Sequence, residues 1–148
     1  MTTAPASSPS APVLNGRVIG LAYHAISAVR DRLLVDSGLT FHQSVALDAV
    51  ADGLDRTGAV EEVTARLKIG PSEVHTLLDE LVAAGLLDAE GASVTEKGGE
   101  IRQGFTDAVA ELAERLYGDL PASDREIAAR ALAHVTARAN AELAAAPA

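Results

Sequence analysis

Apolar residues recur every three or four positions over most of the chain, which predicts helices rather than strands. The most regular stripe is expected on a helix that opens at Pro71, a residue suited to a first turn, and that ends at Gly85, a residue suited to a left-handed cap. A shorter helix is expected directly before it, broken by a turn over residues 68–70. The stripe residues are Val60, Val63, Thr64 and Leu67 in the shorter helix and Val74, Leu77, Leu78 and Leu81 in the other.

A small β-hairpin is predicted after Gly85. Residues 86–89 and 92–94 flank Glu90 and Gly91, a short turn signal between two brief apolar runs. Thr95 is then suited to cap a further helix that has Glu96 in its first turn. Helix, tight turn, helix and hairpin in this order predict the winged form of a helix-turn-helix.

Long helices are predicted on both sides of this lobe. Residues 13–36 carry two apolar stripes, so a helix there must contact two neighbours. Residues 99–145 form two helices with a break at Pro121, after which Ser123 is the expected N-cap. The last helix is rich in alanine, and isolated helices of this kind are marginal in water. We therefore expect 13–36 and 99–145 to be dimerisation helices that pack against a second copy.

The remaining segments complete a mainly α chain of 148 residues. Residues 1–12, rich in Ala, Ser, Thr and Pro, are expected to be a disordered tail. Residues 13–148 are expected to be one domain with the winged helix-turn-helix lobe at 40–98. In this lobe Thr40 is a plausible N-cap for the next helix, and 55–58 is interpreted as a polar loop.

Composition narrows the class of protein. Ala, Leu and Val supply most of the apolar content, with two Phe, two Tyr and no Trp, which favours close-packed helices. The chain has no Cys, which excludes disulfides and thiolate zinc sites. No apolar run approaches the length of a membrane span, and the N-terminus lacks a signal-peptide pattern. A cytoplasmic location without membrane contact is therefore expected.

The order of these elements resembles the MarR family of bacterial regulators over about residues 14–143. The resembling segments are Leu39–Thr40 with Gln43, residues 60–67, Leu77 with Asp79, Leu81 and 85–87, residues 94–98, and residues 120–124. The resemblance implies a triangular homodimer with two winged lobes. It also implies a ligand crevice where each lobe meets the dimerisation helices.

The charges of the lobe depart from the family pattern. Family recognition helices usually carry several Arg, whereas the corresponding positions here are Pro71, Thr76, Glu80 and Ala84. The expected wing tip, 88–93, is short and has no cation. Residues 54–97 hold four cations against nine acids, a net charge of −5, and the whole chain has −9. Because phosphate neutralisation supplies most non-specific affinity, binding to duplex DNA is expected to be weak.

The residues proposed for DNA fall into two groups. Ser72, His75 and Thr76 face away from the apolar stripe and can hydrogen-bond to base edges. Arg66, Lys68 and Lys97 are the cations available for phosphates.

A second candidate site lies at the crevice. The residues expected to line it, and to bind a small aromatic or acidic ligand, are Tyr23, His24, Ser27, Phe41 and His42. His24 and His42 suit an anionic or phenolic ligand because imidazole titrates near neutral pH. The alternative is that each His is a partly buried helix residue with one hydrogen bond. No paired-His spacing or glycine-rich phosphate loop is present, so we expect no metal site and no cofactor.

Three functions follow from these residues. The first is a small-molecule-responsive, homodimeric regulator of transcription. The second is a MarR-like fold that has lost DNA binding and binds or transforms a small molecule, in which case Tyr23, His24 and His42 would supply acid–base chemistry. The third is an interaction protein whose acidic lobe meets a basic partner. No nucleophile motif requires an enzyme, although the pattern leaves that question open.

Overall fold

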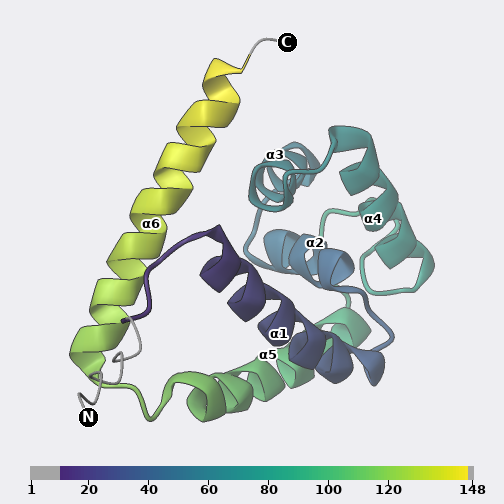
Figure 1. The fold of residues 1–148 in the computed structure, drawn as a ribbon. Coiled ribbons are helices and arrows are strands. Elements are labelled where there is room, and N and C mark those ends of the chain that lie inside the picture. The colour runs from purple at the N-terminus through teal and green to yellow at the C-terminus, as the bar shows by residue number, and fades with distance from the viewer. Residues whose placement is uncertain (1–10, 147–148) are drawn as a thin grey trace, which may run out of the picture. The chain divides into compact units, whose positions relative to one another are not determined.

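Residues 11–146 are described by a computed structural model, drawn in Figure 1. They form six helices: α1 (Gly16–Val35), α2 (Phe41–Ala51), α3 (Arg56–Leu67), α4 (Pro71–Ala83), α5 (Glu96–Tyr117) and α6 (Ala122–Ala145). The chain divides into two compact units, Met1–Phe105 and Thr106–Ala148, with the boundary inside α5. Of the predicted tail, 1–12, all but the last two residues lie outside the described residues. None of the described helices is long and apolar enough to cross a membrane.

The core of the first unit lies between α2, α3 and α4, which group together in Figure 1. The apolar stripes supply it: Val63, Val74 and Leu78 are each fully buried. Leu86 and Leu87, just after α4, close one side of the same core. The helical periodicity therefore predicted the inward-facing residues of this lobe, which we call the winged lobe (residues 40–98).

Several helix ends are as predicted from their local chemistry. The Thr40 hydroxyl accepts a hydrogen bond from the Gln43 amide at 3.1 Å, and the Gln43 side chain accepts one from the Thr40 amide at 3.0 Å, which is a complete capping box. Pro71 is the first residue of α4, and Gly85 after its end has a φ of +76°. The Thr95 hydroxyl accepts from the Gly98 amide in the first turn of α5.

Two predicted boundaries are wrong. Residues 55–58 are not a loop, because the Asp55 carboxylate accepts from the Gly58 amide at 2.8 Å and starts α3 at Arg56. Ser123 is not the N-cap of α6. The Arg125 amide already donates to the Pro121 carbonyl, so the helix begins directly after Pro121 and Ser123 lies inside its first turn.

The predicted β-hairpin is reduced to a single antiparallel bridge between Leu87 and Val94, with no strand in residues 11–146. The intervening loop is closed by Asp88. Its amide donates to the Ser93 carbonyl at 2.9 Å, and its carboxylate accepts from the Ala92 amide at 2.9 Å. Leu86 and Leu87 are both buried before the turn and Ala92 and Ser93 are both exposed after it, so the residues do not alternate between two environments as a longer ladder requires.

The first turns of α5 are anchored to the winged lobe. A Cβ added to Gly98 would lie 2.2 Å from the Leu86 carbonyl oxygen, so only glycine permits this approach. One turn later the Arg102 guanidinium contacts the Asp48 carboxylate of α2 at 2.8 Å. These contacts hold the start of α5 against the winged lobe, and the helix begins directly after Thr95, the predicted cap.

Apolar side chains remain exposed on two of the long helices. On α1 these include Leu14 just before the helix, Val18 and Leu21. On α6 no residue is buried, and Ile127, Leu132, Val135 and Leu143 are all exposed. The predicted stripe of α1 that contains Leu14, Val18 and Leu21, and the thin stripe of α6, are therefore exposed in the single chain.

Candidate functional site

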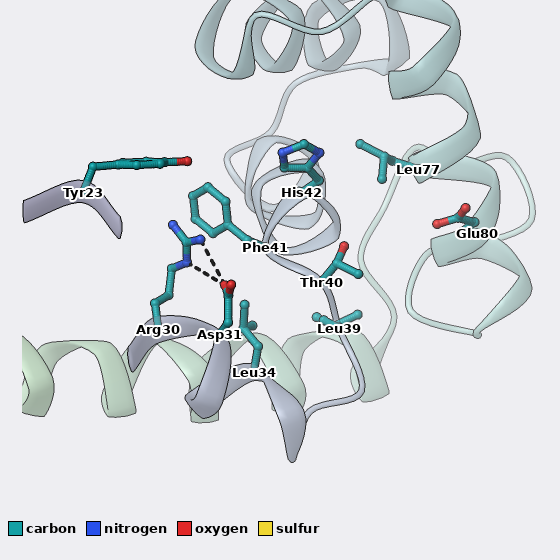
Figure 2. A pocket seen from close by; sticks show the side chains of 10 residues that line it. All are labelled: Tyr23, Arg30, Asp31, Leu34, Leu39, Thr40, Phe41, His42, Leu77 and Glu80. Atoms are coloured by element: carbon teal, nitrogen blue, oxygen red, sulfur yellow. Dashed lines mark hydrogen bonds and ion pairs between the residues drawn. The ribbon is translucent and has the colours of Figure 1, made fainter. Parts of the chain in front are cut away.

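A pocket with a volume of about 580 Å³ lies within the first unit. Figure 2 shows Tyr23 and Arg30 from α1 on one side and Leu77 and Glu80 from α4 on the other, with Phe41 and His42 between them. The lining residues are Tyr23, Arg30, Asp31, Leu34, Leu39, Thr40, Phe41, His42, Leu77 and Glu80. Three helices, α1, α2 and α4, thus contribute to one cavity.

Arg30 and Phe41 form the wall between α1 and α2. The Arg30 guanidinium lies 3.5 Å from the centroid of the Phe41 ring, which is cation–π geometry. The same guanidinium donates to the Asp31 carboxylate from Nε at 3.2 Å and from Nη2 at 3.0 Å. Arg30 is therefore held by two partners, one aromatic and one anionic.

The predicted ligand-binding residues divide into two sets. Tyr23, Phe41 and His42 line the pocket, whereas His24 and Ser27 are not among its lining residues. His24 is exposed on α1, with its ring edge-on to Tyr23 at a centroid distance of 5.3 Å. The Ser27 hydroxyl is buried and has no hydrogen-bond partner among residues 11–146. Of the three residues proposed for acid–base chemistry, two, Tyr23 and His42, therefore share the cavity.

The α4 wall connects the pocket to the winged lobe. Glu80 accepts a hydrogen bond from the Gln43 amide nitrogen at 2.7 Å, so the capping box of α2 is tied to the last turn of α4. A second hollow of about 210 Å³ shares His42 and Leu77 with the first pocket. It is also lined by Ile69, Glu73 and Thr76. The two hollows together follow the face between α2 and α4.

The residues proposed to contact base edges, Ser72, His75 and Thr76, are exposed on α4. His75 is already engaged, because its Nδ1 accepts a hydrogen bond from Arg56 Nε at 3.1 Å. Arg56 also donates to the Asp79 carboxylate at 2.8 Å. The Thr76 hydroxyl donates to the Ser72 carbonyl at 3.1 Å. Several polar groups on this face of α4 are therefore already hydrogen-bonded within the chain.

The proposed phosphate contacts are also partly engaged. Lys68, in a left-handed conformation after α3, donates to the Ala65 carbonyl at 2.6 Å. Lys97 donates to the Ala84 carbonyl at 3.2 Å. Both cations thus stabilise the carboxyl end of a neighbouring or preceding helix. Arg66 is exposed in the last turn of α3.

Sequence reasoning missed some of the charged residues of both sites. Arg30 and Asp31 of the pocket were not selected, and Asp79 and Glu80 had the pattern of a solvated helix face. A weak signal was present for Arg30, since an Arg–Asp pair interrupts the apolar stripes of the first helix. No local pattern indicates that Arg56 meets His75, because these residues are 19 positions apart.

The fold and the pocket can be compared with known proteins. No protein-family model matches the chain, and no curated protein matches it. Solved structures do match, and they define the class of fold: several are described as MarR family proteins or regulators. The chain therefore has the fold of MarR family structures. The sequence identities are low and support the fold alone.

Three of these structures illustrate the likeness. CouR from Rhodococcus jostii RHA1, bound to p-coumaroyl-CoA, has a TM-score of 0.68 and 21% identity over 82% of this chain and 90% of CouR. MepR from S. aureus, in a DNA complex, has a TM-score of 0.66 and 20% identity over 82% and 93%. The MarR family protein Rv2887 from Mycobacterium tuberculosis, with salicylic acid, has a TM-score of 0.60 and 22% identity over 84% and 98%.

Proposed function

We propose that this chain is a homodimeric transcription regulator that responds to a small aromatic molecule and binds DNA weakly. One observation carries the proposal: the pocket of α1 and α2 has part of its wall, Leu77 and Glu80, on α4. In a winged helix-turn-helix the second helix is the one that enters the major groove. A ligand in this pocket would therefore contact the same helix that faces DNA.

The mechanism is a shift between two arrangements of the lobe. A ligand that fills the pocket between α2 and α4 favours whichever arrangement accommodates it best. In a dimer, the two recognition helices must match successive turns of the duplex, so a change in their spacing weakens binding. The hydrogen bond between Gln43 and Glu80 links the first turn of α2 to the part of the pocket wall that lies on α4.

The homodimer is proposed from the unpartnered apolar faces of the long helices. Val135 is 38% exposed and Ile127 is 57% exposed on a helix that buries nothing in the single chain. A helix with that composition gains most of its stability from packing, which a second copy would supply. The exposed stripe of α1 offers a further surface of the same kind.

DNA binding is tested by titrating a short mixed-sequence duplex at several salt concentrations. We expect weak binding with a shallow salt slope, because Lys68 and Lys97 are engaged with carbonyl oxygens and acids surround α4. Thr76→Arg should raise the affinity and steepen the slope by about 1, as one added phosphate contact would. Ala137→Arg adds the same charge on the side of α6 opposite its exposed apolar residues, and it is the control. Tight, steeply salt-dependent binding by the unmodified chain would contradict the proposal.

A second candidate is a small-molecule-binding protein that has lost DNA binding. The engagement of Arg56 by His75 and Asp79 favours it, since this removes a cation from the DNA-facing side of the lobe. Tyr23 and His42 in the pocket would then bind the molecule or exchange protons with it. Selection from a pool of random duplexes separates the two candidates. Enrichment of a sequence that is released by a pocket ligand supports the regulator, and no enrichment beside ligand binding supports the second candidate.

A further inference from the structure

The charge of the pocket is unequal at its two ends. Arg30 is the only Lys or Arg residue that lines the pocket. Asp31 already neutralises its charge and accepts two hydrogen bonds from it. The Arg30 side chain is only 17% exposed, and the ring of Phe41 covers one face of its guanidinium. Asp31 occupies donors on Nε and Nη2, so an anionic ligand could approach only the remaining N–H groups, beside the Asp31 carboxylate. The pocket therefore offers an aromatic acid a cation that is already paired.

Glu80 at the opposite end has no such partner. Its contact from the described residues is the neutral amide of Gln43, which donates to Oε2 at 2.7 Å. Gln43 is itself held by the Thr40 amide, which donates to its side-chain oxygen, so the carboxylate is oriented by a fixed neighbour. No ion pair joins Glu80 to a Lys or Arg of residues 11–146. The negative charge of Glu80 therefore lines the pocket and is not paired with a Lys or Arg of the described residues.

The neighbouring hollow strengthens this asymmetry. Glu73 is its only charged lining residue, and His42 and Leu77 are common to both hollows. With neutral imidazole, the combined lining holds one cation, Arg30, against the acids Asp31, Glu73 and Glu80. The face between α2 and α4 is thus acidic where it is open to a ligand.

We infer that the pocket selects an aromatic ligand that carries a cationic group, and that Glu80 is the residue that determines this specificity. The inference rests on the proposed ligand-binding function and narrows its ligand class from aromatic or acidic molecules to aromatic cations. Tyr23 supplies aromatic surface, whereas Arg30 already covers one face of Phe41, and cations are attracted both to aromatic faces and to carboxylates. An aromatic carboxylate such as the salicylic acid seen with Rv2887 would instead meet Glu80 as a like charge.

Three small probes of nearly equal shape test the charge preference. Benzamidine is cationic, benzamide is neutral and benzoate is anionic, and each is titrated into the full chain by calorimetry at about pH 8, where imidazole is ordinarily neutral. We expect benzamidine to bind about tenfold more tightly than benzoate, with benzamide between them. Glu80→Gln should weaken benzamidine about fivefold and leave benzamide unchanged. Glu90→Gln in the wing loop removes the same charge outside the pocket and should change neither.

The possible results separate the inference from the function on which it rests. Benzoate binding as tightly as benzamidine would overturn the cation preference and leave a ligand-binding pocket in place. An equal loss of benzamidine in Glu80→Gln and Glu90→Gln would show that overall charge, rather than Glu80, attracts the cation. Binding of none of the three probes would contradict the ligand pocket itself, and the inference would fall with it.

Discussion

The winged lobe and α6 both carry apolar residues at helical spacing, but these side chains are buried in the lobe and exposed on α6. In the lobe, Val63, Val74 and Leu78 are fully buried among α2, α3 and α4. On α6, in the second unit, no residue is buried and Val135 is exposed. The lobe therefore buries its own apolar residues, whereas α6 has an apolar face that only another surface can cover. Four pairs of substitutions test this difference, from the largest expected effect to the smallest.

Leu78→Ala should cost the most, because it leaves a cavity at the centre of the lobe. We expect a loss of about 2–5 kcal/mol in the free energy of unfolding, measured by denaturant titration. Leu143→Ala removes the same atoms from a side chain that is 61% exposed on α6, so in the monomeric chain its effect should stay within about 0.5 kcal/mol. A larger loss that grows with protein concentration would come from the dimer contact. Equal losses at the two sites would show that α6 is as well packed as the lobe.

Val135→Asp should separate a homodimer while leaving the winged lobe folded. A charge buried without a partner at an interface costs about 3 kcal/mol, so sedimentation should show monomers at concentrations where the unmodified chain is dimeric. Ala133→Asp places the same charge on nearly the opposite side of α6 and is the control. If the unmodified chain sediments as a folded monomer, the proposed dimer is wrong and the exposed face of α6 needs another explanation.

Two neighbouring glycines at the start of α5 test where the packed region ends and the open region begins. Gly98→Ala places a methyl group against the Leu86 carbonyl oxygen and should destabilise the chain by about 1–3 kcal/mol. Gly99→Ala meets nothing within 4 Å and should stabilise α5 by up to about 1 kcal/mol, because alanine is the better helix former. Thermal unfolding should therefore show a lower melting temperature for Gly98→Ala and a higher one for Gly99→Ala. The same sign for both would mean that α5 does not start against Leu86.

Asp79→Asn should have the smallest effect on stability, within about 1 kcal/mol, because its ion pair with Arg56 is largely exposed. Its informative result is in DNA binding. Release of Arg56 should add one phosphate contact and steepen the salt slope by about 1. Asp119→Asn, after α5, changes the net charge equally outside the lobe and should leave the slope unchanged. A steeper slope in both variants would attribute the change to net charge alone.

The sequence by itself determined the helices and most of their ends. Apolar spacing specified the buried stripes of α3 and α4, because a helix repeats every 3.6 residues whatever surrounds it. Thr40, Pro71, Gly85 and Thr95 act within a few positions of themselves, so their roles follow from local chemistry. Where two local signals competed, as at Asp55 and at Ser123 after Pro121, the sequence alone placed the boundary wrongly.

Only the tertiary structure decided which side chains meet across the candidate sites. The contacts of Gln43 with Glu80 and of Arg56 with Asp79 join residues 37 and 23 positions apart. Periodicity places such polar residues on the outer face of a helix but carries no information about which neighbour faces them. Their partners depend on how α2, α3 and α4 pack, since a rotation of one helix would exchange one set of contacts for another. The pocket and its acidic wall are therefore products of packing, whereas the helices that form them are products of the local sequence.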